Sequence, residues 1–343
     1  MNMRLKGIGV IFLLSISVVV LLYQLATPKI NRRFDFLRNI KNDALAPMDT
    51  VNVRYNSYAV AYVADDSIYL KNTMNPYHVL FIRLHDKDTV HINLSTFPIQ
   101  NFHPQVEVLL PNIFLVDGTI PEVLKASIKT RKTMQYMVNS AYFVEYIPVS
   151  EYSAAVRSLT NGEYALGKQM TDTPYVWFNR DLLQKQVDGI FCTDGMLRYN
   201  RELNRLVYTY FYRNEFIQLD TSLVLISRNK TIDPIDTAQI EITYVKTDNT
   251  RTHSKPPLRV NNRTFTSGKW LFVQSALMAK NDREDLFRTS PMIDVYDLTT
   301  SRYKFSFYVP SFGGIQMRDF GFHGSSLIVL YERHLVSYKL SFK

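Results

Sequence analysis

The side chains that could bind a metal ion or act in catalysis are few and scattered along this chain. Its seven histidines are His78, His85, His91, His103, His253, His323 and His334. They form no HxH, HExxH or Cys/His pattern, the spacings that direct imidazoles to one metal ion. His85 and His91 could meet across a hairpin near Asp86 and Asp88, but charged side chains are usual at such a turn. We therefore expect neither a metal site nor a cofactor.

The single cysteine, Cys192, lies in "GIFCTDG" beside Ile190 and Phe191. A lone cysteine forms no intrachain disulfide, and these neighbours predict a small buried side chain rather than an activated thiolate. The sequence also contains no GxSxG elbow, P-loop, CxxCH haem attachment or dinucleotide fingerprint. No catalytic residue is predicted.

Several acidic and interface-prone side chains form a candidate binding set. Three aspartates precede glycine, and Asp-Gly is foremost a turn former, which is the first interpretation of each. The alternative is that some of these turns surround a ligand. Arginine and tyrosine side by side are typical of interfaces, and an aspartate next to Arg318 is comparable. The candidate residues are Asp117, Asp188, Asp194, Tyr212, Arg213 and Asp319.

The elements that would position these side chains are strands, because apolar and polar residues alternate with period two from about residue 50 onward. The segment Asn204–Ile226 places three apolar runs almost end to end, with two short polar breaks. Both faces of its first strand are apolar, with Leu206 and Tyr208 on one side and Val207 on the other. A sandwich strand usually shows one face to water, whereas a propeller blade is covered on both faces by its neighbours.

Similar units recur along the chain and predict an all-β fold with a single β-propeller domain over residues 50–343. At about 40–50 residues per blade, this length gives six or seven blades. We expect six, because residues 238–312 read as one blade with long excursions. The last unit offers only three strands, so we expect the strand near Thr50–Tyr55 to complete it and close the ring. A large two-sheet β structure is the alternative.

Three phrases carry a resemblance to a known group of proteins. They are "NIFLVDGTIPEVLKASI", "NRLVYTYFYRNEFIQLDTSLVLI" and "MIDVYDLTTSRYKFSFYVP". They resemble uncharacterised bacterial membrane-anchored or secreted proteins with six-bladed β-propeller-type repeats. The resemblance covers most of residues 55–343 and is carried mainly by strand and turn residues. It implies the fold and no particular activity.

The amino-terminal region predicts a membrane anchor. A short basic tail (1–6) precedes residues 7–26, and Gly7–Leu25 contains no charged side chain. At 1.5 Å per residue this stretch nearly spans a hydrocarbon core of about 30 Å. We expect a transmembrane signal-anchor helix in the lipid bilayer, followed by a basic juxtamembrane linker or amphipathic helix (27–49). The main domain would lie outside a bacterial cytoplasmic membrane, in the periplasm. Secretion after signal cleavage is the alternative.

The charge pattern bears on the partner. The formal net charge is +9, of which residues 1–50 carry +4, so the remainder has no concentrated basic stripe. The densest basic patch, Lys129–Lys132, is explained by a solvated hairpin end, and we expect no nucleic-acid partner.

The absence of catalytic spacings favours a binding or assembly module that holds a protein, peptide or glycan. The candidate residues would then lie at the mouth of the propeller channel. A lactonase-like hydrolase or lyase with its site in the central channel is the alternative, and an accessory subunit of a membrane complex is a third. Propellers serve all three purposes, so the fold does not choose between them.

Overall fold

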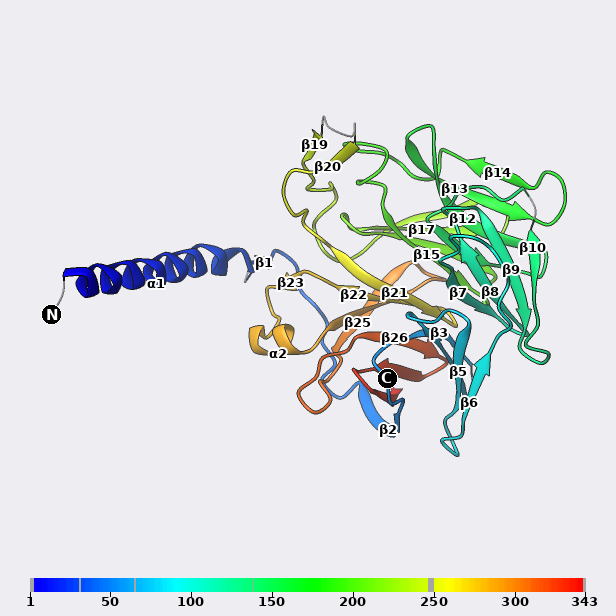
Figure 1. Ribbon diagram of the computed structural model, residues 1–343, viewed down its shortest axis with the longest axis horizontal. Helices are drawn as coiled ribbons and strands as arrows, with labels where there is room; N and C mark the ends of the chain where they lie inside the picture. The colour runs from blue at the N-terminus through cyan, green and yellow to red at the C-terminus, as the bar shows by residue number, and fades with distance from the viewer. Residues whose placement is uncertain (1–2, 31, 65, 138, 246–249, 342–343) are drawn as a thin grey trace.

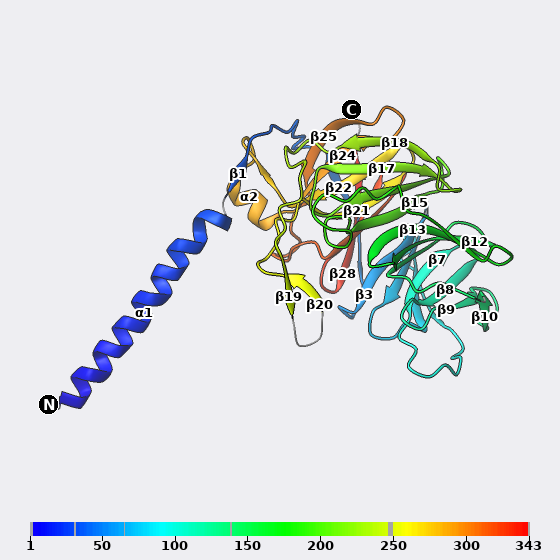
Figure 2. The ribbon, with the colours of Figure 1, turned by 90° about the horizontal axis from the view of Figure 1, so that it is seen from above.

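The protein is an all-β, six-bladed β-propeller, as predicted (Figure 1). The computed structural model describes residues 3–30, 32–64, 66–137, 139–245 and 250–341. Six four-stranded antiparallel sheets form the blades, and the first strand of each blade contacts the first strands of the two neighbouring blades. These six first strands therefore form an inner ring around the axis. Figure 2 shows the propeller from a second direction.

The first three blades follow one another along the chain. Blade one contains β3 (Tyr58–Val63), β4 (Ser67–Asn72), β5 (His78–Arg83) and β6 (Thr89–Asn93). Blade two contains β7 (Gln105–Leu109), β8 (Asn112–Asp117), β9 (Glu122–Ser127) and β10 (Thr133–Met137). Blade three contains β11 (Glu145–Pro148), β12 (Ser153–Thr160), β13 (Glu163–Met170) and β14 (Val176–Asn179).

The other three blades include the long insertions between strands and the strand that closes the ring. Blade four contains β15 (Gly195–Asn200), β16 (Arg205–Tyr210), β17 (Glu215–Asp220) and β18 (Leu225–Lys230). Blade five contains β21 (Asn261–Ser267), β22 (Trp270–Ser275), β24 (Met292–Asp297) and β25 (Arg302–Tyr308). Blade six contains β26 (Asp319–His323), β27 (Ser326–Leu330), β28 (His334–Leu340) and β2 (Leu45–Asn52). Outside the blades lie the helix α2 (Glu284–Thr289) and a hairpin of β19 (Ile242–Val245) and β20 (Thr250–His253).

The middle strands are buried on both faces, which explains their unbroken apolar sequences. Every residue of β8 and of β24 is buried. The apolar clusters lie between blades: Val79 of blade one packs with Ile113 of blade two. Burying an aliphatic side chain of this size stabilises the fold by roughly 1.5–3 kcal/mol. The stability of each blade therefore depends on both of its neighbours.

The predicted closure of the ring by an early strand is confirmed, but the strand runs from Leu45 to Asn52 and not over Thr50–Tyr55. Strand β2, from the beginning of the chain, pairs antiparallel with β28, near its end. In this pairing Thr50 lies opposite Val336 and Val51 opposite Leu335. Val51 is buried in a cluster that joins blade six to blade one. The closing strand thus supplies both the last hydrogen-bonded edge and part of the last apolar interface.

A segment before β2, which we call the neck (residues 33–44), lies along blade five. Its first residues form β1 (Arg33–Phe34), which pairs parallel with β23 (Met278–Ala279). Phe34 and Phe36 are buried against Leu277 and other apolar residues there. The described residues 32–44 contain no helix.

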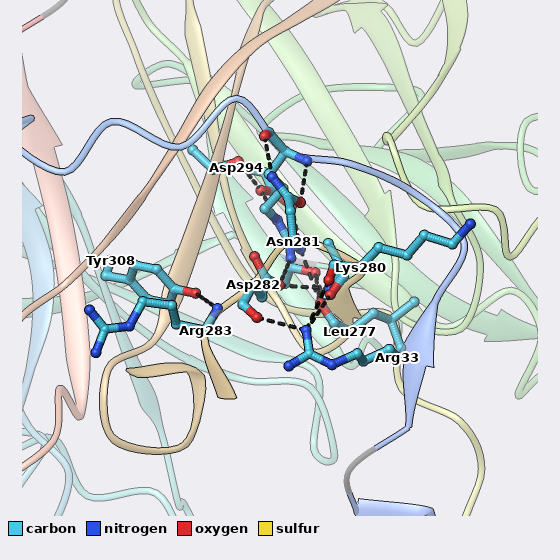
Figure 3. A network of polar contacts seen from close by, with 12 residues as sticks. Arg33, Leu277, Lys280, Asn281, Asp282, Arg283, Asp294 and Tyr308 are labelled. Atoms are coloured by element: carbon cyan, nitrogen blue, oxygen red, sulfur yellow. Dashed lines mark hydrogen bonds and ion pairs between the residues drawn. The ribbon is translucent and has the colours of Figure 1, made fainter. Parts of the chain in front are cut away.

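The neck is fixed by a buried charged network, part of which Figure 3 shows. Arg38 is buried; its Nε donates to Asp294 Oδ1 at 2.8 Å, and it also forms an ion pair with Asp282. Its Nη2 donates to the carbonyl of Leu277 at 3.1 Å. Arg33 Nη1 donates to the carbonyl of Asp282 at 2.7 Å. The neck is therefore part of the folded domain and not a flexible tether.

The helix α1 (Met3–Ile30) precedes the neck and projects away from the propeller (Figures 1 and 2). Among the described residues, no helix combines the length and the apolarity needed to cross a membrane. The membrane span predicted for residues 7–26 is therefore not confirmed.

The closure predicts a large effect at Val51, which is 6% exposed. Val51→Asp places a carboxylate in the apolar interface between blades six and one, and we expect it to lower the free energy of unfolding by more than about 3 kcal/mol. Met48→Asp is the matched control, because Met48 lies on the same strand and is 57% exposed. Urea denaturation measures both variants. Similar stability of the two would show that β2 does not close the ring.

The neck predicts a second effect. Arg38→Met leaves the buried carboxylates of Asp282 and Asp294 without their cation, and we expect a loss of about 3–5 kcal/mol in the free energy of unfolding. Asp35→Asn removes only an exposed ion pair with Lys280 and should leave the stability unchanged. Chemical denaturation measures the free energy of unfolding of both variants. Equal values for Arg38→Met and Asp35→Asn would show that the neck is not part of the folded domain.

Candidate functional site: the central channel

The inner ring encloses a cavity of about 360 Å³ that is lined by residues of all six blades. The wall includes Tyr62 of β3, Glu107 of β7, Ile147 of β11, Arg198 of β15, Arg263 of β21 and Asp319 of β26. A propeller brings these residues together because the first strand of every blade faces the axis. The cavity is therefore built by six segments that are far apart in sequence.

Three ion pairs lie at the cavity, and each joins two neighbouring blades. Lys71 Nζ lies 3.2 Å from Glu107 Oε1, between blades one and two. Arg263 Nη1 lies 3.0 Å from Asp319 Oδ1, between blades five and six.

The third pair joins blades three and four, and it includes a buried acid. Arg198 Nη1 lies 3.3 Å from Glu145 Oε1, and Arg157 Nε lies 3.4 Å from Glu145 Oε2. Burial raises the pKa of Glu145 above its usual value, although both arginines and the backbone amide of Leu197 oppose this effect. The three pairs hold their own charged groups in place before any ligand arrives.

Arg201 differs from the other cations of the wall. It follows β15 in blade four, and its Nη1 donates to the hydroxyl of Tyr62 in blade one at 2.8 Å. Its guanidinium carbon lies 4.3 Å from the centre of the Tyr62 ring. Nη2 reaches the carbonyl of Val108 in blade two at 3.5 Å. Blade one lies opposite blade four in the ring, so the Arg201 side chain reaches across the channel.

No carboxylate forms an ion pair with Arg201 in the part of the chain that the structure describes. The other cations of the wall, Lys71, Arg198 and Arg263, each have one. A partly buried arginine guanidinium commonly forms hydrogen bonds to a carboxylate or a phosphate, which also balances its charge. Arg201 therefore has unused capacity for an anionic group.

Of the six residues predicted from sequence, Asp319 lies in the channel wall. Its Oδ2 accepts a hydrogen bond from the amide of Val60 at 2.8 Å, in addition to its pair with Arg263. It therefore joins blade six to blades five and one. Its binding role remains a prediction.

The three aspartates that precede glycine have separate surroundings. Asp117 is buried, and its carboxylate accepts bonds from Thr119 and from the amide of His103 at 2.8 Å. Asp188 accepts bonds from the backbone amides of Phe191 and Cys192. Asp194 pairs with Arg157 at 2.6 Å. Each carboxylate holds a turn or an interface between blades.

Tyr212 and Arg213 are both buried. The guanidinium of Arg213 lies 3.6 Å from the centre of the Tyr210 ring, and its Nε lies 3.0 Å from Glu215. Tyr212 packs with Cys192, which is buried as predicted. These two residues lie outside the wall of the central cavity.

A second recess, of about 750 Å³, lies between the chain leading into blade four and the β19–β20 hairpin. Asp188 lines it, with Tyr244 and Arg251 of the hairpin. Lys185 and Glu163 also line it and form an ion pair at 2.7 Å. The recess is open and lies away from the inner ring. Within the described residues, no group of three His, Cys, Asp or Glu side chains is arranged to hold a metal ion.

The comparisons with known proteins concern the fold. No family model matches the chain, and no curated protein matches it. A solved member of the DUF4221 family from Bacteroides vulgatus is 11% identical, with a TM-score of 0.51 over 87% of this chain and 97% of that chain. A structural genomics protein of unknown function from Bacteroides thetaiotaomicron is 9% identical, with a TM-score of 0.51 over 88% of this chain and 73% of that chain.

A third solved structure is an inactive variant of virginiamycin B lyase from Staphylococcus aureus. It is 11% identical, with a TM-score of 0.49 over 85% of this chain and 99% of that chain. The two Bacteroides structures have TM-scores above 0.5, and likeness at their sequence identities shows the fold alone. The predicted resemblance to six-bladed propeller proteins is thus confirmed for the fold, and a bacterial origin and membrane anchoring are not shown.

The surroundings of Asp117 predict a pH-dependent contribution to stability. Burial by itself would raise the pKa of Asp117, but the hydrogen bonds from Thr119 and His103 outweigh it and lower the pKa. A lowered folded-state pKa stabilises the fold above the unfolded-state pKa of about 3.9, and this contribution is lost as the pH falls through the folded-state value. We expect Asp117→Asn to lower the free energy of unfolding by about 1–3 kcal/mol at pH 7. The amide NH₂ of asparagine would face a hydrogen-bond donor of Thr119 or His103, with which it cannot form a hydrogen bond.

Denaturation of the wild type and Asp117→Asn between pH 3 and pH 7 measures this contribution. The difference in the free energy of unfolding between the wild type and Asp117→Asn should become smaller below about pH 4. Asp172→Asn, at an exposed position, is the control. A difference that does not change with pH would contradict the assigned hydrogen bonds.

Proposed function

We propose that the protein is a binding module that holds a small polar ligand, or the polar end of a peptide or glycan, in its central channel. The observation that carries this proposal is the cavity lined by all six blades, several of whose charged groups are already fixed in pairs between blades. A rigid site of this kind loses little conformational entropy on binding. Its volume lies in the range of small-molecule sites, about 300–1,000 Å³.

The state of the acids in the wall favours binding over proton transfer. Glu107 and Asp319, two of the three acids that line the cavity, each pair with a cation of the neighbouring blade. A carboxylate oxygen that already binds a cation is less available to remove a proton, whereas the carboxylate can still accept a hydrogen bond from a ligand. Conversion of a bound ligand to a product would instead favour the hydrolase or lyase alternative.

Filling the channel tests the proposal. Ala59 lines the cavity, and Ala59→Trp should occupy space that a ligand needs. The matched control is Ala46→Trp, because Ala46 is exposed on the outer strand β2. The probes are galacturonate, galactose, N-acetylglycine, N-acetylglycinamide and glycylglycine, each added to the full chain in a thermal unfolding assay.

We expect at least one probe to raise the Tm of the wild type and of Ala46→Trp by about 2–4 °C at a concentration near ten times its Kd. The same probe should not raise the Tm of Ala59→Trp. An equal rise in all three proteins, or no rise with any probe, would contradict a binding site in the channel.

A further inference from the structure

The guanidinium of Arg201 is held in place without its charge being neutralised. The Tyr62 ring supports it, and the Tyr62 hydroxyl accepts a hydrogen bond from Nη1. The contact from Nη2 to Val108 is long, at 3.5 Å. Arginine has five N–H donors in a fixed fork, so most of its donors remain available. The side chain is half-buried in the cavity wall, where water screens a charge less than at the surface.

The hydroxyl of Tyr62 adds a second donor at the same place. A phenol can accept and donate at once, and this oxygen accepts from Arg201. Its own proton can therefore point to an oxygen atom of a ligand. Two donors from opposite blades thus converge on one point of the channel, an arrangement that suits a group with two acceptor oxygens in one plane.

We propose that this channel binds the carboxylate of a small organic acid, with Arg201 and Tyr62 as the recognising residues. The inference rests on the proposed binding function of the channel and specifies its ligand class. An arginine and a planar carboxylate form parallel charge-assisted hydrogen bonds, the geometry that the fork matches best. The bound carboxylate would supply the anion that Arg201 lacks among the described residues.

The neighbouring charges favour a single negative charge on the ligand. Glu202 follows Arg201 in the chain and lines the same cavity. Unlike Glu107 and Asp319, it forms no ion pair among the described residues. The Glu202 carboxylate would repel a phosphate dianion more strongly than a carboxylate monoanion. A cavity of about 360 Å³ also limits the enclosed part of the ligand to the size of a sugar acid or an amino-acid derivative.

A carboxylate of this size has two sources, a uronic acid and the acid end of an amino acid or peptide. Galacturonate represents the first, with galactose as its neutral partner. N-acetylglycine represents the second, with N-acetylglycinamide as its neutral partner. Inorganic phosphate tests whether the site prefers a ligand group with a single negative charge. Titration calorimetry with the full chain measures each affinity.

Three variants identify the recognising residues. Arg201→Gln should weaken binding of the acid at least about tenfold, because one charge-assisted bond to an ionised group is worth that much. Arg201→Lys keeps the charge, and the loss of the fork should still weaken binding several-fold. Tyr62→Phe should weaken it by a smaller factor. Arg180→Gln, at an exposed arginine, is the control and should bind like the wild type. Circular dichroism confirms that each variant is folded.

The results separate this inference from the proposed function. If a neutral probe binds as tightly as its acid and loses its affinity in Ala59→Trp, the channel is a binding site and the carboxylate inference is wrong. The same conclusion follows if folded Arg201→Gln binds the acid like the wild type, or if phosphate binds as tightly as the acids. If no probe binds, or if every probe binds Ala59→Trp like the wild type, the proposed function fails as well.

Discussion

The whole structure depends on one constraint, that each sheet has two apolar faces and only a neighbouring sheet can cover each of them. Strands β8 and β24 are buried along their entire length because sheets lie on both sides. An open arc of such sheets would leave two apolar faces and two unpaired edges in water. The chain avoids this by returning β2 from its beginning to β28 near its end. Closure is therefore a condition of stability for every blade.

The closed ring also determines what the centre can do. Six inner strands converge, and most of the charged side chains at the cavity are held in pairs, because an unpaired charge in a partly buried wall is costly. Three ion pairs between neighbouring blades satisfy this requirement. Arg201 is satisfied instead by a tyrosine of the opposite blade. The architecture that stabilises the sheets thus also places one cation with spare capacity in a small cavity.

More of the fold than of the candidate site could be predicted from the sequence. The two apolar faces of Asn204–Ile226 indicated a blade, and the three-stranded last unit indicated that an early strand must close the ring. Arg198 and Arg263 lie on the first strands of their blades. Recognising that the first strand of each blade faces the channel would have identified both arginines as candidate site residues. The pairing of Arg201 with Tyr62 had no signal in sequence, because these residues meet only once blades four and one face each other. The neck was missed for the same reason: Arg38 meets Asp294 from far away in the chain.

Native-state hydrogen exchange tests the central claim, that the six blades form one closed cooperative unit, most directly. If each blade depends on both neighbours, the most protected amides of β4, β8, β12, β16, β24 and β28, one strand from each blade, should exchange through one common opening. Their free energies of exchange should then agree with one another and with the global free energy of unfolding. A blade whose middle strand exchanges at a much lower free energy than the others would contradict the claim.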